Sequence, residues 1–447
     1  MSKNKKTLLL IAGFVVVWVG AYFGLKKPEA VRPLPELSNR SGSGTASAEF
    51  LNTKHAFEYY RAEIRKDPKV VKNYVQLAQL FLQEGRITGR HHEYIPKAQT
   101  LLADALALDA KDFEALVTQA SLLMTLHKFE EAKALAEQAL AMAPHNAICH
   151  GILSDALLEL GDYEQAVKMC DKMLSLRPDL RSYSRAAYLR ELHGDIAGAQ
   201  QVMKLACDAG VSGQEQRAWA LYQLGKLYLN EGKLDTAAYI FSGILAERPE
   251  YAYALSGLAQ VNLAKKNYDE ALAALKLIYK DTPEHAFLEQ LVEAYHVTGQ
   301  IVEAEKMTKL VLEAYRQHEQ DGWEVDLEYA RFCTNYDLNL PEALLRAERE
   351  YQRRPHNLDV LEVYAVALYK NGQPEKAEPL IKQALRLQTQ RSSLYFHAGI
   401  IAQQLGKTTE AQTRLEHALT LAANLSVRDA ATARAALAAV RANGQAS

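Results

Sequence analysis

The stretch AICHGILSDALLELGDYEQAVKMCDKMLSLRP, residues 147–178, decides the fold of this 447-residue chain. Apolar residues recur at helical spacing on both sides of Gly161, Ala166 follows five positions after the glycine, and Pro178 follows twelve positions after the alanine. Glycine readily ends a helix because it adopts left-handed backbone angles without a Cβ clash, and proline prevents a helix from continuing. The stretch therefore predicts a helix, a tight turn, a second helix and a stop.

The same spacing recurs along most of the chain. Alanines lie 34 residues apart in three runs: Ala98, Ala132 and Ala166; Ala237 and Ala271; and Ala343, Ala377 and Ala411. A fixed period of this length is typical of a solenoid, in which each helix pair buries its apolar face against the next pair. We predict an all-α solenoid of about ten helix pairs over residues 49–425. A capping helix and tail would follow over residues 426–447.

Composition excludes several functional classes. The chain is 49% hydrophobic and 24% charged with a net charge of −2, which is ordinary globular composition, so we expect no nucleic-acid partner. No H-E-x-x-H, Gly-rich phosphate loop, G-x-S-x-G or dinucleotide motif occurs. We therefore predict a protein that is not an enzyme and has no catalytic residues, metal or small-molecule cofactor. The cysteines are scattered, form no C-x-x-C pair and are predicted to be buried apolar residues: Cys149, Cys170, Cys207 and Cys333.

The first 48 residues differ from the repeats. Residues 8–25, LLLIAGFVVVWVGAYFGL, carry no charge and follow three lysines. A helix of this length spans about 27 Å, close to the hydrocarbon core of a bilayer. We predict a retained transmembrane signal anchor over residues 1–27, because no A-x-A-like cleavage site follows it. The basic flank would place the N-terminus in the cytoplasm and the solenoid on the periplasmic side of the inner membrane. Residues 28–48 would form a flexible linker.

Three segments carry a resemblance to a known repeat family. They read LxxxGDYEQAVxxxDxxLxLRP at residues 157–178, LGKLYLNEGKLDTAAYIFSGILAERP at residues 224–249, and LYKNGQPEKAEPLIKQALRL at residues 368–387. These segments resemble tetratricopeptide repeats, and the resemblance extends over roughly residues 50–421. It implies a right-handed superhelix whose concave surface, lined by the first helix of each pair, binds peptides or partner domains. An anchor, a linker and such repeats are together similar to bacterial envelope proteins that scaffold other proteins.

An aromatic strip is the first candidate binding site. In the family pattern the second residue of a first helix points into the concave groove, and here Trp219, Tyr253 and Phe287 occupy that position at intervals of 34. Tyr222 and Lys226 follow Trp219 by three and seven residues and would share its helix face. An exposed aromatic strip is typical of a contact surface. The alternative is that neighbouring helices cover these rings as ordinary core.

A basic and aromatic segment, RSYSRAAYLRELHGD at residues 181–195, lies next to this strip. Its arginines include Arg185, which we predict to recognise a peptide carboxylate or an acidic segment of a partner. The alternative is that these arginines are solvated or paired with neighbouring acidic residues.

His91, His92 and Glu93 suggest a metal site but lack further ligands at suitable spacing. They fall in an eight-residue excess, around ITGRHHEYIP, that we place between the helices of the first pair. Adjacent histidines in a loop rarely converge on one ion. We therefore predict a solvated loop here and no metal site.

The leading functional hypothesis is a membrane-tethered scaffold that binds a partner protein or peptide in its concave groove, for envelope assembly or complex stability. The membrane contact would run through residues 8–25. Two alternatives stay open. The chain could be a non-catalytic subunit of a larger secretion or enzyme complex, or it could bind a saccharide or polymer by stacking on aromatic rings such as Trp219.

Overall fold

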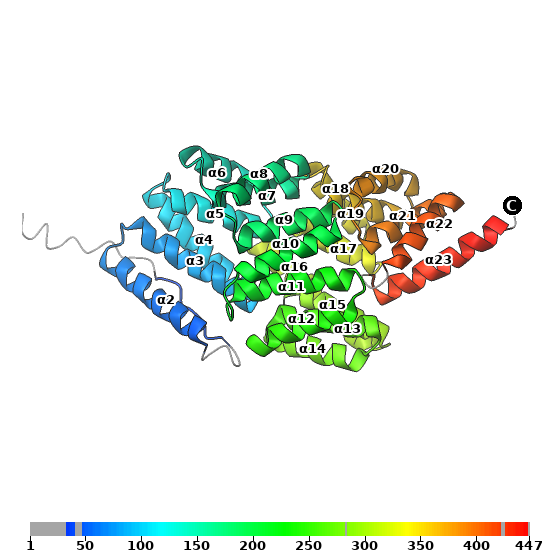
Figure 1. The fold of residues 1–447 in the computed structure, drawn as a ribbon, viewed down its shortest axis with the longest axis horizontal. Coiled ribbons are helices and arrows are strands. Elements are labelled where there is room, and N and C mark those ends of the chain that lie inside the picture. Colours follow the sequence, from blue (N-terminus) through cyan, green and yellow to red (C-terminus); the bar gives the residue numbers. More distant parts are fainter. Residues whose placement is uncertain (1–32, 41–46, 282–283, 422–424, 446–447) are drawn as a thin grey trace, which may run out of the picture.

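The computed structural model describes residues 33–40, 47–281, 284–421 and 425–445, which fold into 22 α-helices and contain no strand (Figure 1). The prediction of an all-helical solenoid is therefore confirmed. α2 (Ala48–Lys66) comes first and α23 (Val427–Gln445), which packs on α22, comes last. Between them lie ten helix pairs.

The pairs are α3 (Val71–Thr88) with α4 (His91–Leu108), α5 (Phe113–Thr125) with α6 (Phe129–Met142), α7 (Ala147–Leu160) with α8 (Tyr163–Leu176), α9 (Leu180–Leu192) with α10 (Ile196–Ala209), α11 (Glu215–Asn230) with α12 (Leu234–Glu247), α13 (Ala252–Lys265) with α14 (Tyr268–Asp281), α15 (His285–Val297) with α16 (Ile301–Gln320), α17 (Asp326–Asn335) with α18 (Leu340–Arg353), α19 (Leu358–Lys370) with α20 (Pro374–Ala384), and α21 (Ser392–Gln404) with α22 (Thr408–Thr420). The short 3-10 helix η2 (Leu385–Leu387) extends α20.

The pair α7–α8 shows why the repeat spacing produces this fold. Gly161 ends α7 with φ +85°, and the side chain of Asp162 accepts a hydrogen bond from the Gln165 amide at the start of α8. Ala166 is fully buried, and its carbonyl accepts a 2.8 Å hydrogen bond from the Ser154 hydroxyl of α7. A methyl group at position 166 thus allows the two helices to lie in close contact.

The prediction of a loop between the helices of the first pair is wrong. The eight additional residues do not form a loop between its helices. They lengthen α3 and α4 to 18 residues each, and His91 and His92 belong to the first turn of α4. The four cysteines are free and buried, as predicted.

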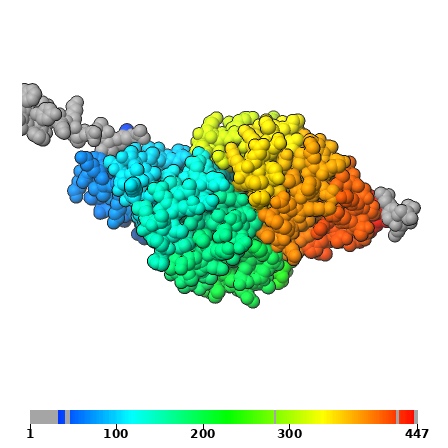
Figure 2. Space-filling view, turned by 90° about the horizontal axis from the view of Figure 1, so that it is seen from above, coloured from blue at the N-terminus to red at the C-terminus, as the bar shows by residue number. Residues whose placement is uncertain are grey.

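The solenoid packs against itself, and this closure is the main architectural finding. The turns that follow α3, α5, α7 and α9 lie against the segments that precede α15, α17, α19 and α21, so that residues 193 to 198 positions apart form hydrogen bonds. Figure 2 shows cyan and green residues of the first half of the chain meeting yellow and orange residues of the second half along a continuous line. We call this contact the seam. Residues that form it are Leu126, His127, Glu159, Tyr163, Leu192, Glu324, Arg354, Asn357, Leu358 and Thr389.

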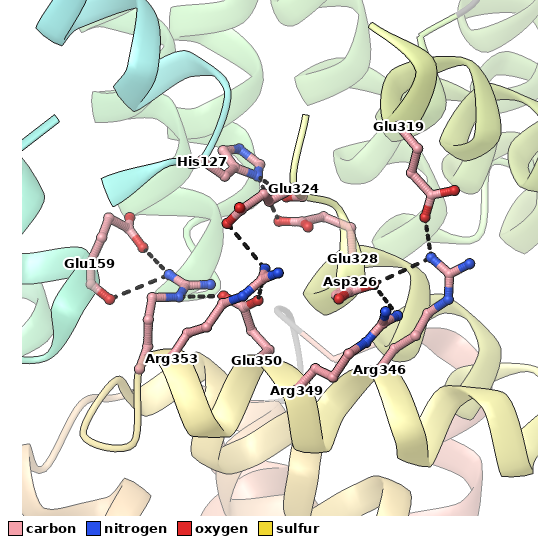
Figure 3. Close-up of polar contacts among 11 residues, drawn as sticks. His127, Glu159, Glu319, Glu324, Asp326, Glu328, Arg346, Arg349, Glu350 and Arg353 are labelled. Carbon is pink, nitrogen blue, oxygen red and sulfur yellow. Dashed lines mark hydrogen bonds and ion pairs between the residues drawn. The ribbon is translucent and has the colours of Figure 1, made fainter. Parts of the chain in front are cut away.

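Backbone and charged groups both hold the seam. The Glu324 amide donates to the Leu126 carbonyl at 3.0 Å, and the Asn357 side chain donates to the Glu159 carbonyl at 2.9 Å. Arg354 is 5% exposed and pairs with the Glu159 carboxylate at 2.8 Å. Figure 3 shows the charged cluster around this contact, in which Arg353 of α18 reaches Glu324. Both arginines also pair with Glu350 of α18, at 2.5 Å from Arg354 and 3.3 Å from Arg353, so Glu350 holds them in place on their own side of the seam.

Residues 33–40, which the sequence assigned to a flexible linker over residues 28–48, lie along α3 and α4. Arg40 is 6% exposed and bonds to Glu84 at 2.9 Å and 2.5 Å and to Glu49 at 2.9 Å. Lys97 donates to the Glu36 carbonyl at 2.9 Å. This segment is therefore packed onto the first helix pair.

The predicted location requires a correction. Among the described residues, no helix is both long enough and apolar enough to cross a membrane. This finding overturns the prediction of a single-pass inner-membrane protein with a periplasmic solenoid. The predicted anchor, residues 8–25, lies outside the described residues.

Candidate functional site: the inner groove

The first helices of successive pairs line a cavity of ≈ 790 Å³ on the inner face of the solenoid, which we call the inner groove. α7, α9 and α11 contribute most of its wall, with single residues from α3 and α13. Its apolar lining comes from Met124, Ile148, Ile152, Leu158, Leu180, Leu189, Met203 and Leu227. Clefts of this size with an apolar lining and a few polar groups are typical ligand sites.

Four of the six predicted site residues lie in the inner groove: Arg185, Trp219, Lys226 and Tyr253. Trp219 is 36% exposed, and Tyr188 of α9, a second aromatic residue of the lining, is 39% exposed. Tyr253 is half-buried and its ring centroid lies 5.5 Å from that of Tyr222. The exposed aromatic surface of the groove is therefore provided by α9 and α11.

Tyr222 and Phe287 do not line the groove. Tyr222 is 8% exposed and packs with Ala218 and Phe241, whereas Phe287 is 4% exposed and packs with Leu288 and Leu291. For these two rings the alternative interpretation as core is correct. Phe287 lies in the first turn of α15, and the residue that caps α15, Glu284, accepts a hydrogen bond from the His91 amide across the closure. The aromatic strip therefore becomes progressively more buried from Trp219 to Phe287, because Phe287 packs into the core that α13, α15 and α17 share.

Arg185 is not a free cation. Its Nε lies 2.9 Å from Oδ1 and 3.0 Å from Oδ2 of Asp155, and its Nη2 lies 2.6 Å from Oδ2. Burial acts against its charge, but the Asp155 carboxylate outweighs burial and raises the pKa of Arg185. Asp155 also lines the groove. The predicted arginine is thus present in the groove as half of a fork-shaped ion pair.

Two other arginines add positive charge to the groove, where the charge of Arg86 also acts on the Glu215 carboxylate. Arg86 of α3 and Arg181 of α9 both line the groove and are exposed, and neither forms a side-chain ion pair among the described residues. Partial desolvation of the guanidinium by the groove wall, followed by the charge of Arg86, lowers the pKa of Arg181, although the Asp179 carboxylate acts in the opposite direction. We predicted Arg181 as part of a basic segment, but Arg86 was missed. It lies in the last turn of α3, which exists only because that helix is longer than its counterparts.

The groove continues into a second cavity of ≈ 480 Å³, to which Tyr188, Glu191, Gln223 and Lys226 also contribute. The charges around Arg391 in this second cavity are paired. Arg391 bonds to Asp359 and lies 3.4 Å from Glu362, and His397 Nδ1 lies 2.9 Å from Glu362 Oε1. Burial opposes ionisation of Asp359, but the Arg391 and Arg331 charges outweigh it and lower its pKa to about 2. Arg86 and Arg181 therefore place positive charge at the α3 and α9 end of the groove, and Lys226 places another cation where the two cavities meet.

The family model of the tetratricopeptide repeat matches residues 123–191 and 228–288, which include nearly all of α7, α9 and α13. The chain contains tetratricopeptide repeats. This fold supports protein–protein interaction in general, and tetratricopeptide-repeat proteins are typically non-catalytic scaffolds.

Curated relatives of this tetratricopeptide-repeat chain are distant. Cellulose synthase operon protein C of Pseudomonas fluorescens (strain SBW25) is 23% identical over 188 residues, which make up 40% of this chain and 14% of the relative. Tetratricopeptide repeat protein 21B of Xenopus laevis is 24% identical over 287 residues, which make up 58% of this chain and 21% of the relative. The chain thus corresponds to a small part of either relative.

Solved structures are also similar to the chain. The human IFIT1 dimer with PPP-AAAA is 16% identical, with a TM-score of 0.45 over 84% of this chain and 89% of that one. Yeast Tom70 is 15% identical, with a TM-score of 0.35 over 88% and 94% of the two chains.

Proposed function

We propose that this protein is a scaffold whose inner groove holds a segment of a partner protein that carries both carboxylates and apolar side chains. The observation that supports this most is the pairing of exposed Trp219 and Tyr188 with exposed Arg86 and Arg181 around one ≈ 790 Å³ cavity. Tryptophan, tyrosine and arginine are the residue types that dominate binding energy at protein interfaces.

Different groove residues would contact the apolar and the acidic side chains of the bound segment. Trp219 and Tyr188 offer rings to apolar side chains of the segment, and the apolar floor from α7 continues that surface. Arg86 and Arg181 attract its carboxylates. Arg185 neutralises Asp155, which would otherwise repel an acidic ligand from the same wall. Lys226 adds a cation where the groove meets the second cavity.

The proposal is compatible with a place in a larger complex, where the groove would hold a neighbouring subunit. A saccharide is the second candidate, since a sugar ring could stack on Trp219 and one relative is a cellulose synthase operon protein. The exposed arginines favour the acidic segment, because a neutral sugar has no charge to pair with them.

The test is a fluorescence anisotropy titration of the full chain with a labelled peptide of alternating Glu and Leu residues, and with its Lys and Leu counterpart. We expect the acidic peptide alone to bind, with affinity falling as salt rises. Trp219→Ala should weaken binding by about 30-fold, the effect of losing a central aromatic contact of about 2 kcal/mol. Arg181→Glu should weaken it by at least about 10-fold.

Matched controls come from the outer surface. Tyr239→Ala removes an aromatic ring that is 81% exposed on α12, and Arg316→Glu reverses an exposed charge on α16. Both should bind the acidic peptide as the unaltered protein does. Equal losses in the groove variants and these controls would refute the proposal. A change in tryptophan fluorescence with a neutral β-1,4-glucan oligosaccharide, lost in Trp219→Ala, would instead identify the groove as a saccharide site.

A further inference from the structure

Four of the thirteen histidines gather where three helix ends meet. His91 and His92 begin α4, His285 begins α15 immediately after Glu284, and His318 lies in the last turn of α16. α4 belongs to the first half of the solenoid, while α15 and α16 belong to the second half. The cluster therefore brings together residues that are nearly 200 positions apart in the sequence, as the 193-residue separation of His91 and Glu284 shows.

The Glu284 carboxylate is at the centre of this cluster. Its Oε1 lies 3.6 Å from His91 Nδ1 and 3.9 Å from His92 Nδ1, and its Oε2 lies 3.7 Å from His318 Nε2. The His91 backbone amide donates to Oε1 at 3.0 Å. Imidazole nitrogens thus approach both oxygens of one carboxylate from different helices.

The cluster is buried and incompletely hydrogen-bonded. Glu284 is 8% exposed and His318 is 4% exposed. Nδ1 of His318, Nδ1 of His285 and Oδ2 of neighbouring Asp321 are buried without a hydrogen-bond partner among the described residues. Buried polar atoms in folded proteins nearly always have a partner, so three such atoms on residues of one cluster point to a missing ligand.

The arrangement has the chemistry and the size of a metal site. One ligand atom each from Glu284, His285 and His318 lies within 4.8 Å of the other two. Donors around a tetrahedral Zn²⁺ are about 3.3 Å apart, so small side-chain rotations would bring the three to bonding distance. Imidazole with one carboxylate is a ligand set that suits Zn²⁺ and related first-row ions and does not suit Mg²⁺ or Ca²⁺.

We propose that Glu284, His285 and His318 bind one divalent transition-metal ion, with Zn²⁺ as the best fit, and that His91 or His92 supplies a fourth ligand from α4. Asp321 stands beside the ligands as a carboxylate that can accept the outer N–H of a bound imidazole, the role that such groups have around zinc. The ion would tie the start of α4 to α15 and α16. It would thereby hold the two halves of the solenoid together at the end of the aromatic strip.

The test measures Zn²⁺ binding by the full chain after removal of metal with EDTA, by calorimetry and by competition with a chromophoric chelator. We expect one ion per chain and a thermal unfolding midpoint that rises when Zn²⁺ is added. Co²⁺ as a spectroscopic probe should show the visible absorption of a four-coordinate site. His318→Gln should weaken Zn²⁺ binding by at least about 100-fold, because removing a ligand costs at least as much as removing its supporting group.

His145→Gln is the matched control, since His145 is exposed and outside the cluster. It should bind Zn²⁺ and shift its unfolding midpoint as the unaltered protein does. His285→Gln provides a second ligand variant if the circular dichroism spectrum of His318→Gln shows loss of helix. Binding by the unaltered protein that is no tighter than in His285→Gln would overturn the proposal, and so would an equal loss in His145→Gln.

Discussion

Replacing Gly161 by alanine tests the closure of the solenoid through a single methyl group. A Cβ at this position would lie 2.3 Å from the His356 carbonyl carbon and 2.6 Å from the Asn357 nitrogen, both backbone atoms of the opposite side of the seam. Backbone cannot move aside as a flexible side chain can. The substitution must therefore separate the two sides of the seam or distort the turn after α7.

Gly372→Ala separates this effect from backbone strain. Gly372 occupies the equivalent turn between α19 and α20 with φ +73°, and a Cβ there would meet nothing within 4 Å. Alanine in the left-handed region costs about 1–2 kcal/mol at either position. At Gly161 the collision adds about 1–3 kcal/mol of overpacking. We expect Gly161→Ala to lower the free energy of unfolding by about 2–5 kcal/mol and Gly372→Ala by only about 1–2 kcal/mol.

Hydrogen exchange measures the difference in stability between the two variants at single amides of the seam. A local measurement is needed because unfolding of a long repeat array need not be two-state. The Leu358 amide donates to the Tyr163 hydroxyl at 2.8 Å across the seam. Its exchange should be about 5- to 150-fold faster in Gly161→Ala than in Gly372→Ala, the factor that corresponds to the additional 1–3 kcal/mol. Equal exchange of the Leu358 amide in the two variants would refute the closure.

Two further predictions concern the interior of the solenoid. Ala166→Leu should destabilise the protein by about 1–3 kcal/mol in urea unfolding, because the position is fully buried, while Ala141→Leu on the exposed face of α6 should change stability by less than about 0.5 kcal/mol. Glu289 accepts a 2.6 Å hydrogen bond from Tyr315, and burial raises the pKa of Glu289 to about 7. The protonated Glu289 side chain therefore stabilises the fold fully below pH 4.5, and this stabilisation is lost as pH rises through 7. Between pH 4.5 and 7.5 the free energy of unfolding should therefore vary by up to about 3 kcal/mol less in Glu289→Gln than in the unaltered protein. Glu313→Gln, on the surface of α16, should leave this pH dependence unchanged. An unchanged pH profile in Glu289→Gln, or equal destabilisation by the two leucine substitutions, would contradict these assignments.

The helix pairs were predictable from sequence because each depends on local residues. Gly161 and Ala166 lie within one repeat, and their backbone and packing roles follow from spacing alone. A 34-residue period does not determine the pitch of the superhelix, however, and therefore does not tell which repeats come into contact. The contact between Glu159 and Arg354 joins residues 195 positions apart, and no spacing rule relates them.

In the candidate site, too, the sequence predicted the residues whose position depends on a single repeat. Trp219 and Tyr253 line the groove because their position in the repeat points inward. Phe287 has the same repeat position, but its ring is buried in the core with Leu288 and Leu291. His91 looked like a solvated loop residue because its neighbour Glu284 comes from a helix pair six units later. The failure at Phe287 has a local origin in the packing of neighbouring repeats, whereas the failure at His91 comes from contact between distant parts of the solenoid.

Small-angle X-ray scattering of the full chain tests this closure most directly. The distribution of interatomic distances in solution should match the compact superhelix of Figure 1, remain unchanged in Gly372→Ala and broaden in Gly161→Ala. A longer, open particle for the unaltered protein, with the same distribution in all three proteins, would contradict the account.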